Sequence, residues 1–260
     1  MACQPTLPST LKTLVALLRL LRLVLHLAQG LWIIRVVFPR LSGDQRDARV
    51  QAWAMQALSH LGLKVSILGT PPKSGPVLLV ANHISWADIV VMHAARHCRF
   101  VAKADVGRWP VVGTLATAAG TLYVARESRK DAMRVVHRMV ECLAQDEVLA
   151  VFPEGTTGNG ATLLPFHGNM LQAAITADAP VQPVALSFLD VASGTQSFAP
   201  CYIGNDTLVG SLWRTLRADA LVAIVHYGDM QRAEGRDRRT WSADLRSTIE
   251  TLRSQPVEVS

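Results

Sequence analysis

The sequence predicts an α/β protein with a mostly parallel central sheet covered by helices, preceded by an amphipathic helical segment at the N-terminus. Three observations lead to this prediction. Short, continuous apolar runs alternate with segments of helical spacing, as in sheets buried on both faces. Half of the 260 residues are hydrophobic, which excludes a disordered chain and requires a large core or contact with a membrane. The first 40 residues combine a long apolar run with basic residues.

The N-terminal run, residues 14–38, is long enough as a helix to cross a hydrocarbon layer of roughly 30 Å. At 100° per residue, the polar residues of this region share an arc of about 100°. These residues are Lys12, Arg19, Arg22, His26 and Gln29. An arginine at the middle of a bilayer costs at least ~2.5 kcal/mol. We therefore expect the helix to lie in the interface, with its arginines against anionic headgroups.

Other arrangements of this segment remain open. Gly30 and Pro39 bound a second short apolar piece, so a re-entrant hairpin or a tilted span with snorkelling arginines also fits. A helix buried against the rest of the protein is another alternative. A secretory signal peptide fits poorly, because arginines interrupt the apolar run. We divide the chain into a membrane-associated segment, residues 1–40, and an α/β domain, residues 41–260.

The distribution of charge favours an anionic membrane surface over nucleic acid as partner. The net charge is +6, and residues 1–40 hold five basic residues and no acidic one. The four cysteines are far apart and form no CxxC pair, so neither a disulfide framework nor a structural zinc site is expected. Together these features predict a reducing compartment, at the cytoplasmic face of the cell inner membrane, with attachment through residues 12–38.

In the α/β domain, residues 44–62 have helical spacing and end at Gly62. Strands are predicted at LKVSIL, VLLVA, RFVAK, TLYVA, EVLAVF, VQPVALSF and ALVAIVHYG. Further helices are predicted at 86–97, 128–145, 168–178, 206–217 and 240–253. In such sheets, sites form beyond the carboxyl ends of the strands, so residues that follow strands are the first candidates for function.

The strand VLLVA is followed by NHISWAD, which contains a candidate catalytic pair. His83 comes two residues after the strand, and Asp88 falls in the first turn of the next helix, from which its carboxylate can reach the imidazole. A carboxylate on one ring nitrogen fixes the tautomer and raises the basicity of the other nitrogen, as in a general base acting on a hydroxyl. Taken alone, the spacing favours a helix cap at Ser85 or Asp88 beside a strand-end histidine.

Other strands end in residues suited to an anionic ligand. Glu154 and Gly155 follow EVLAVF and open a glycine-rich loop with free backbone N–H groups. Lys103 and Arg126 follow RFVAK and TLYVA, at the edge of the sheet where His83 is expected. Both cations are placed to hold a phosphate.

The blocks NHISWAD, GTLYVAR, FPEGTT and APVQPVAL resemble, in this order, the four motifs of the glycerolipid acyltransferase family, which includes 1-acyl-glycerol-3-phosphate acyltransferases. The resemblance covers residues 60–230. It implies that His83 is the general base that deprotonates the acceptor hydroxyl and that Asp88 orients it. The acyl donor would be acyl-CoA or acyl-carrier protein, with no cofactor, no metal and no acyl-enzyme.

The resemblance also implies roles in binding the lysophospholipid acceptor. It assigns Arg126 to the acceptor's phosphate and places the block-three residues Glu154, Gly155, Thr156 and Thr157 around the acceptor. Pro183 of the fourth block would shape the acyl or acceptor pocket.

Two departures from the family pattern concern the acceptor. Lysophosphatidate acyltransferases usually have arginine where this chain has Thr157, and lysine where it has His167. Each missing charge-assisted bond is worth about 1.5–3 kcal/mol. The FPEGTT form resembles lyso-ornithine lipid acyltransferases, whose acceptor carries no phosphate. We predict lysophosphatidate as acceptor, with lyso-ornithine lipid as the alternative.

Rival classes of protein lack their motifs in this sequence. No Gly-x-Ser-x-Gly nucleophile turn of an α/β hydrolase occurs, and neither does a nucleotide-binding P-loop. A non-catalytic lipid-binding protein of the same fold is the alternative from another class. The presence of both His83 and Asp88 favours an enzyme.

Overall fold

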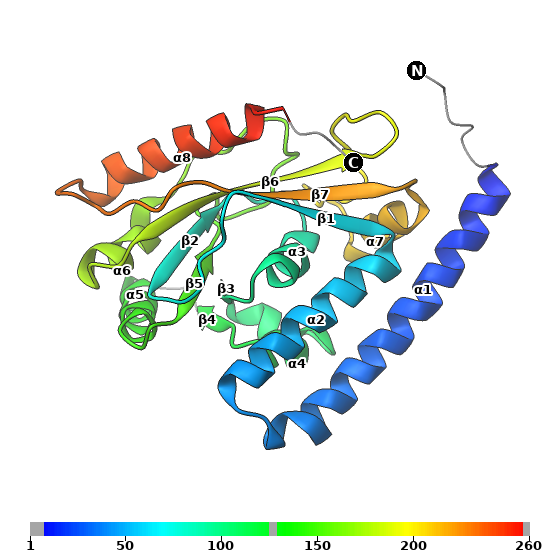
Figure 1. Ribbon diagram of the computed structural model, residues 1–260, viewed down its shortest axis with the longest axis horizontal. Helices are drawn as coiled ribbons and strands as arrows, with labels where there is room; N and C mark the ends of the chain where they lie inside the picture. Colours follow the sequence, from blue (N-terminus) through cyan, green and yellow to red (C-terminus); the bar gives the residue numbers. More distant parts are fainter. Residues whose placement is uncertain (1–7, 125–128, 257–260) are drawn as a thin grey trace.

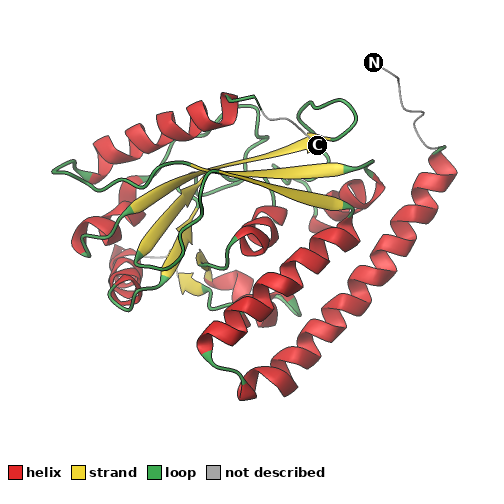
Figure 2. Ribbon diagram, viewed as in Figure 1, coloured by secondary structure: helices red, strands yellow, loops and turns green. Residues whose placement is uncertain are grey.

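A twisted seven-stranded sheet separates two layers of helices (Figures 1 and 2). The computed structural model describes residues 8–124 and 129–256. In the order in which they are hydrogen-bonded, the strands are β1 (Leu63–Leu68), β7 (Leu221–Tyr227), β6 (Val181–Asp190), β2 (Val77–Ala81), β5 (Val148–Val151), β3 (Arg99–Lys103) and β4 (Leu122–Val124). All seven predicted strands are thereby confirmed.

Strands β6, β2, β5, β3 and β4 run parallel, whereas β7 is antiparallel to β6 and carries β1 parallel to itself. The carboxyl ends of β2, β3, β4 and β5 therefore meet at one edge. All five residues of β2 are buried, with Leu79 and Ala81 in one core and Leu78 and Val80 in the other. This double burial explains why the central strands read as unbroken apolar runs.

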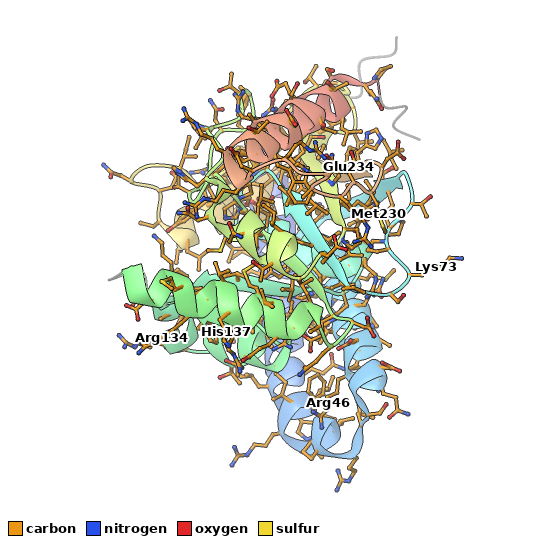
Figure 3. The ribbon with its side chains drawn as sticks, turned by 90° about the vertical axis from the view of Figure 1, so that its left-hand side faces the viewer. Arg46, Lys73, Arg134, His137, Met230 and Glu234 are labelled. Atoms are coloured by element: carbon orange, nitrogen blue, oxygen red, sulfur yellow. The ribbon has the colours of Figure 1, made fainter. Side chains whose placement is uncertain are left out.

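Each face of the sheet carries its own helices. One core contains residues of α1 (Ser9–Trp32), α2 (Gly43–Leu61), α3 (Ala87–Ala95) and α7 (Leu208–Arg217). The other core contains residues of α5 (Arg129–Leu143), α6 (Leu171–Thr176) and α8 (Arg238–Ser254). Figure 3 shows Arg134 and His137 on the outward surface of α5 and Arg46 near the turn between α1 and α2.

The ends of the helices follow from local sequence. A capping box between Ser42 and Gln45 begins α2, and Gly62 ends it with a φ of 75°, a conformation that glycine adopts without strain. Asp237 caps α8 by accepting two backbone N–H bonds. The short elements η3 (Ala104–Arg108) and α4 (Val112–Ala118) were not predicted, because 5 and 7 residues are too few to show a helical stripe.

The structure confirms the N-terminal helix. The prediction that its basic stripe faces the headgroups of a membrane is wrong for most of the stripe. Lys12 pairs with Asp219 at 2.7 Å, and Arg19 donates to the carbonyls of Leu216 and Ala218 at the end of α7. His26 is buried. Most of the polar stripe therefore packs on the domain rather than on headgroups, because buried carbonyls and a carboxylate are available there. Burial lowers the pKa of Arg19.

The outward side of α1 is apolar instead. Its exposed large hydrophobic residues are Leu11, Leu14, Leu17, Leu18, Leu21, Val24, Leu25 and Trp32. We call these residues the outer face of α1. Figure 1 shows this helix along the edge of the molecule, with no described element on its outer side. The helical segment Ser9–Arg40, which a π turn (Ile33–Val37) and a 3₁₀ turn (Phe38–Arg40) complete, is long and apolar enough to cross a membrane.

Candidate active site

The predicted pair forms at the end of β2. The Nδ1 atom of His83 lies 2.8 Å from Oδ2 of Asp88, which stands in the first turn of α3. The same oxygen accepts the backbone N–H groups of Ile84 and Ser85, at 2.7 and 2.9 Å. Because this oxygen is an acceptor throughout, Nδ1 of His83 carries the proton and Nε2 keeps its lone pair. The side chain of Asp88 is fully buried, whereas that of His83 is 20% exposed.

Asn82 and Ser85 hold the turn that presents His83. The side chain of Asn82 donates to Leu186 O and accepts from Leu186 N, which ties the end of β2 to β6. The hydroxyl of Ser85 donates to Pro200 O at 2.5 Å. Sequence reasoning gave neither residue a role, although a polar residue directly after a fully apolar strand was the available signal.

Glu154 lies beneath this turn and is buried. Its Oε1 accepts the backbone N–H of His83 at 2.6 Å, and its Oε2 accepts that of Leu164 at 2.8 Å. Burial raises the pKa of Glu154, and these two hydrogen bonds oppose that rise. In this geometry the carboxylate joins the turn that carries His83 to the loop after β5, while its expected contact with the acceptor stays a prediction.

The loop after β5 is bound to the same turn by its backbone. The N–H of Gly158 donates to His83 O at 2.8 Å. Gly155 has a φ of 71°, which only glycine adopts freely. The hydroxyl of Thr157 donates to Tyr202 O, so this side chain holds the loop against the segment between β6 and α7. Thr156 is exposed.

Phe152 was not singled out from the sequence, yet it contacts His83 directly. The two rings are stacked, and Phe152 in turn stacks on Phe100 with centroids 5.6 Å apart. The available signal was its place as the last residue of the run EVLAVF, immediately before the PEG turn.

Of the two predicted cations, the structure describes Lys103, which lies on the far side of β5 from His83. Lys103 ends β3 and is exposed, and it has no ion pair among the residues that the structure describes. Arg126 follows β4 and lies outside the described residues. Within the described part of the edge, the structure thus brings together His83, Asp88 and Glu154 and leaves Lys103 two strands away.

Comparison with known proteins settles the family. The Acyltransferase family model matches residues 62–187. A lyso-ornithine lipid O-acyltransferase from Pseudomonas aeruginosa is 36% identical over 88% of this chain and 88% of its own. The chain belongs to the acyltransferase family. This confirms the resemblance found in the sequence and the expectation of an enzyme.

Two further similar proteins are also named acyltransferases. A 1-acyl-sn-glycerol-3-phosphate acyltransferase from Neisseria gonorrhoeae is 32% identical over 83% of this chain and 84% of its own. The crystal structure of the 1-acyl-sn-glycerophosphate (LPA) acyltransferase PlsC from Thermotoga maritima has the same fold, with a TM-score of 0.66, 17% identity and coverage of 95% of this chain and 98% of that one. The relatives that match over most of this chain are thus acyltransferases named for lyso-ornithine lipid or for 1-acyl-sn-glycerol-3-phosphate.

Proposed function

We propose that this acyltransferase moves a fatty acyl chain from acyl-CoA or acyl-carrier protein to the free hydroxyl of 1-acyl-glycerol-3-phosphate, which yields phosphatidate for phospholipid synthesis. The observation that carries the proposal is the bond between Nδ1 of His83 and the buried carboxylate of Asp88, at 2.8 Å. This bond leaves Nε2 as the basic atom on the partly exposed side of the ring.

In the proposed mechanism, Nε2 of His83 takes the proton of the acceptor hydroxyl as its oxygen attacks the thioester carbonyl. The tetrahedral intermediate collapses, the C–S bond breaks, and the protonated imidazole returns the proton to the leaving thiolate. Asp88 stabilises the imidazolium that exists between the two transfers. The reaction needs neither an acyl-enzyme nor a cofactor, because the donor thioester is already activated.

Recognition of the acceptor is proposed for the neighbouring strand ends. Lys103 is exposed and has no ion pair among the described residues, so its ammonium is available for a phosphate. Arg126, which follows TLYVA in the sequence, is the second proposed phosphate ligand. Gly155 and Thr156 supply N–H and hydroxyl groups in the loop after β5.

Lyso-ornithine lipid is the second candidate acceptor. Thr157 occupies the position where lysophosphatidate acyltransferases usually carry arginine, and its hydroxyl is engaged by Tyr202. The Pseudomonas aeruginosa relative named for lyso-ornithine lipid supports the same candidate. Such an acceptor demands fewer cations, which fits a site with a threonine at this position.

We further propose that the acyltransferase works at the cytoplasmic face of the cell inner membrane and docks there through the outer face of α1. One substrate is an amphiphile and the donor is water-soluble, so the reaction requires a site at the membrane surface. The leucines of this outer face supply an apolar docking surface, and Arg22, Arg35 and Arg40 are exposed for contact with anionic headgroups.

The test compares wild type, His83→Ala and Asp88→Asn with each acceptor and each donor. General-base catalysis contributes about 10²–10⁴-fold, so both variants should lose activity by that order while binding vesicles like wild type. Consumption of lysophosphatidate alone supports the first acceptor, and consumption of lyso-ornithine lipid alone selects the second. Undiminished turnover by His83→Ala would remove His83 as the base.

A further inference from the structure

A surface cavity outside the active site lies between α7, the N-terminal half of α1 and the segment that joins β6 to α7. Its volume is about 700 Å³. Apolar side chains line it, among them Phe198 and Trp213, together with the cationic side chains of Lys12, Arg214 and Arg217. Figure 1 shows α7 beside the upper half of α1, so two elements that are far apart in sequence build this cavity.

Two of the three cations are neutralised within the protein. Lys12 pairs with Asp219. Arg214 forms a two-bond pair with Asp206, with distances of 3.0 and 2.8 Å. These ion pairs hold the side chains of Lys12 and Arg214 in place and neutralise their charges.

Arg217 differs from both. Its Nη2 donates to the hydroxyl of Ser9 at 3.3 Å, and no carboxylate pairs with it in residues 8–124 and 129–256. Arg217 as a whole residue is half-buried, and it lines the cavity beside the apolar side chains. An arginine in such a lining without a counter-charge favours an anionic ligand.

The apolar part of the lining indicates that the ligand carries an apolar portion in addition to its anionic group. Phe198 is 55% exposed and Ile203 is 40% exposed, which a cavity for a small hydrophilic anion does not require. Lys12 stands on α1 between Leu11 and Leu14, both members of the outer face of α1. The apolar surface proposed to contact the membrane therefore continues to the rim of the cavity.

From this combination we infer that the cavity binds one anionic phospholipid, with its headgroup at Arg217 and an acyl chain along Phe198 and Trp213. The site is separate from the acceptor site at His83 and goes beyond the proposed function. It would hold the acyltransferase on anionic membranes by a specific contact, in addition to general attraction.

The cavity is separated from the catalytic turn by a single stretch of chain. Cys201 lines the cavity. Its neighbour Pro200 accepts the hydroxyl of Ser85, and the N–H of Tyr202 donates to Ile84 O at 3.2 Å. A lipid in the cavity therefore contacts the segment that supports the turn carrying His83.

The test titrates full-length protein with dihexanoyl phosphatidylglycerol below its critical micelle concentration and follows the heat of binding. The His83→Ala variant is measured in parallel, so that the result does not depend on turnover or on the proposed reaction. We expect one lipid per chain in both proteins. Arg217→Gln should weaken binding about fivefold or more, as expected for one cation near an anionic lipid. Phe198→Ser, a change of an exposed side chain, should weaken it as well.

Two controls locate the binding. Arg239→Gln removes an exposed arginine from α8, on the opposite face of the sheet, and should leave the affinity unchanged. Lys103→Gln should also leave it unchanged; loss of binding there would assign the lipid to the active site and overturn the inference. Equal binding by Arg217→Gln and wild type, equal affinity for dihexanoyl phosphatidylcholine, or full competition by glycerol 3-phosphate would each overturn it too.

Discussion

The imidazole of His83 lies parallel to the phenyl ring of Phe152, with ring centroids 4.0 Å apart and an angle of 9° between the planes. With the bond to Asp88 at one edge, this contact holds the ring in a single orientation. The face of a phenyl ring also attracts a cation, so Phe152 favours the imidazolium of the proposed mechanism, in which His83 takes the proton of the acceptor hydroxyl.

The stacking predicts the behaviour of Phe152→Leu. An aromatic pair contributes about 0.5–1.5 kcal/mol, so kcat should fall about 2- to 10-fold, with the KM of both substrates unchanged. Phe152→Tyr should retain kcat because the ring remains. Steady-state kinetics check this. Phe100→Leu is the matched control: this ring stacks on Phe152 but not on His83, so it should reduce stability and spare kcat. A rise in acceptor KM in Phe152→Leu would show that the ring binds substrate instead.

Glu154→Gln should destabilise the fold. The carboxylate accepts one backbone N–H on each oxygen, whereas a glutamine amide offers one acceptor and points a donor at the other N–H. We expect a loss of about 1–3 kcal/mol in the free energy of unfolding, measured by urea denaturation. Thr156→Val, an exposed change in the same loop, should leave it unaltered. If Glu154 instead contacts the acceptor, Glu154→Gln will raise the acceptor KM without loss of stability.

The burial of His93 predicts that the protein loses stability in mild acid. This side chain is buried, its Nδ1 has no hydrogen bond among the described residues, and burial lowers its pKa to about 3. A histidine whose folded pKa lies below its unfolded pKa of 6.5 stabilises the fold fully above pH 6.5. That stability is lost as the pH falls from 6.5 towards 3.

The measurement follows the free energy of unfolding of wild type and His93→Leu at pH 7 and pH 5. Wild type should lose about 2 kcal/mol more than the variant over this interval, because only wild type must keep His93 neutral. Other titrating groups, including the nearby pair of His97 and Asp47, are common to both proteins. Equal pH dependence in the two proteins would show that His93 does not limit stability in acid.

The outer face of α1 predicts weaker membrane binding for a double variant, Leu18→Ser with Leu25→Ser. These side chains are 49% and 63% exposed, so the changes should leave the fold intact. The lost apolar burial should lower partition into vesicles about tenfold or more, measured by co-sedimentation. Met133→Ser removes a still more exposed apolar residue, 73% exposed, from α5 in the other layer of helices, and should have no effect. Retained binding by the double variant would place the docking surface elsewhere.

The sequence by itself determined the sheet and the contact between His83 and Asp88. Short, mostly apolar runs predicted all seven strands, and the runs of β2 and β5 are unbroken because both faces of these strands are buried. His83 and Asp88 were also within reach, since five residues across a strand-to-helix turn bring a carboxylate back to the ring by local geometry alone. Motif order then pointed to the family.

Only the tertiary structure decided what each polar group faces. The stripe of α1 has the periodicity of a membrane-docking surface, yet Arg19 and His26 turn inward, because the carbonyl ends of α7 and the side of α2 lie there to receive them. The sequence placed Glu154 at the acceptor and gave no sign that its carboxylate accepts the backbone N–H of His83, 71 residues away, and that of Leu164, 10 residues away. Such long-range pairings leave no periodic trace in a single sequence, since neither partner shows where the other will lie.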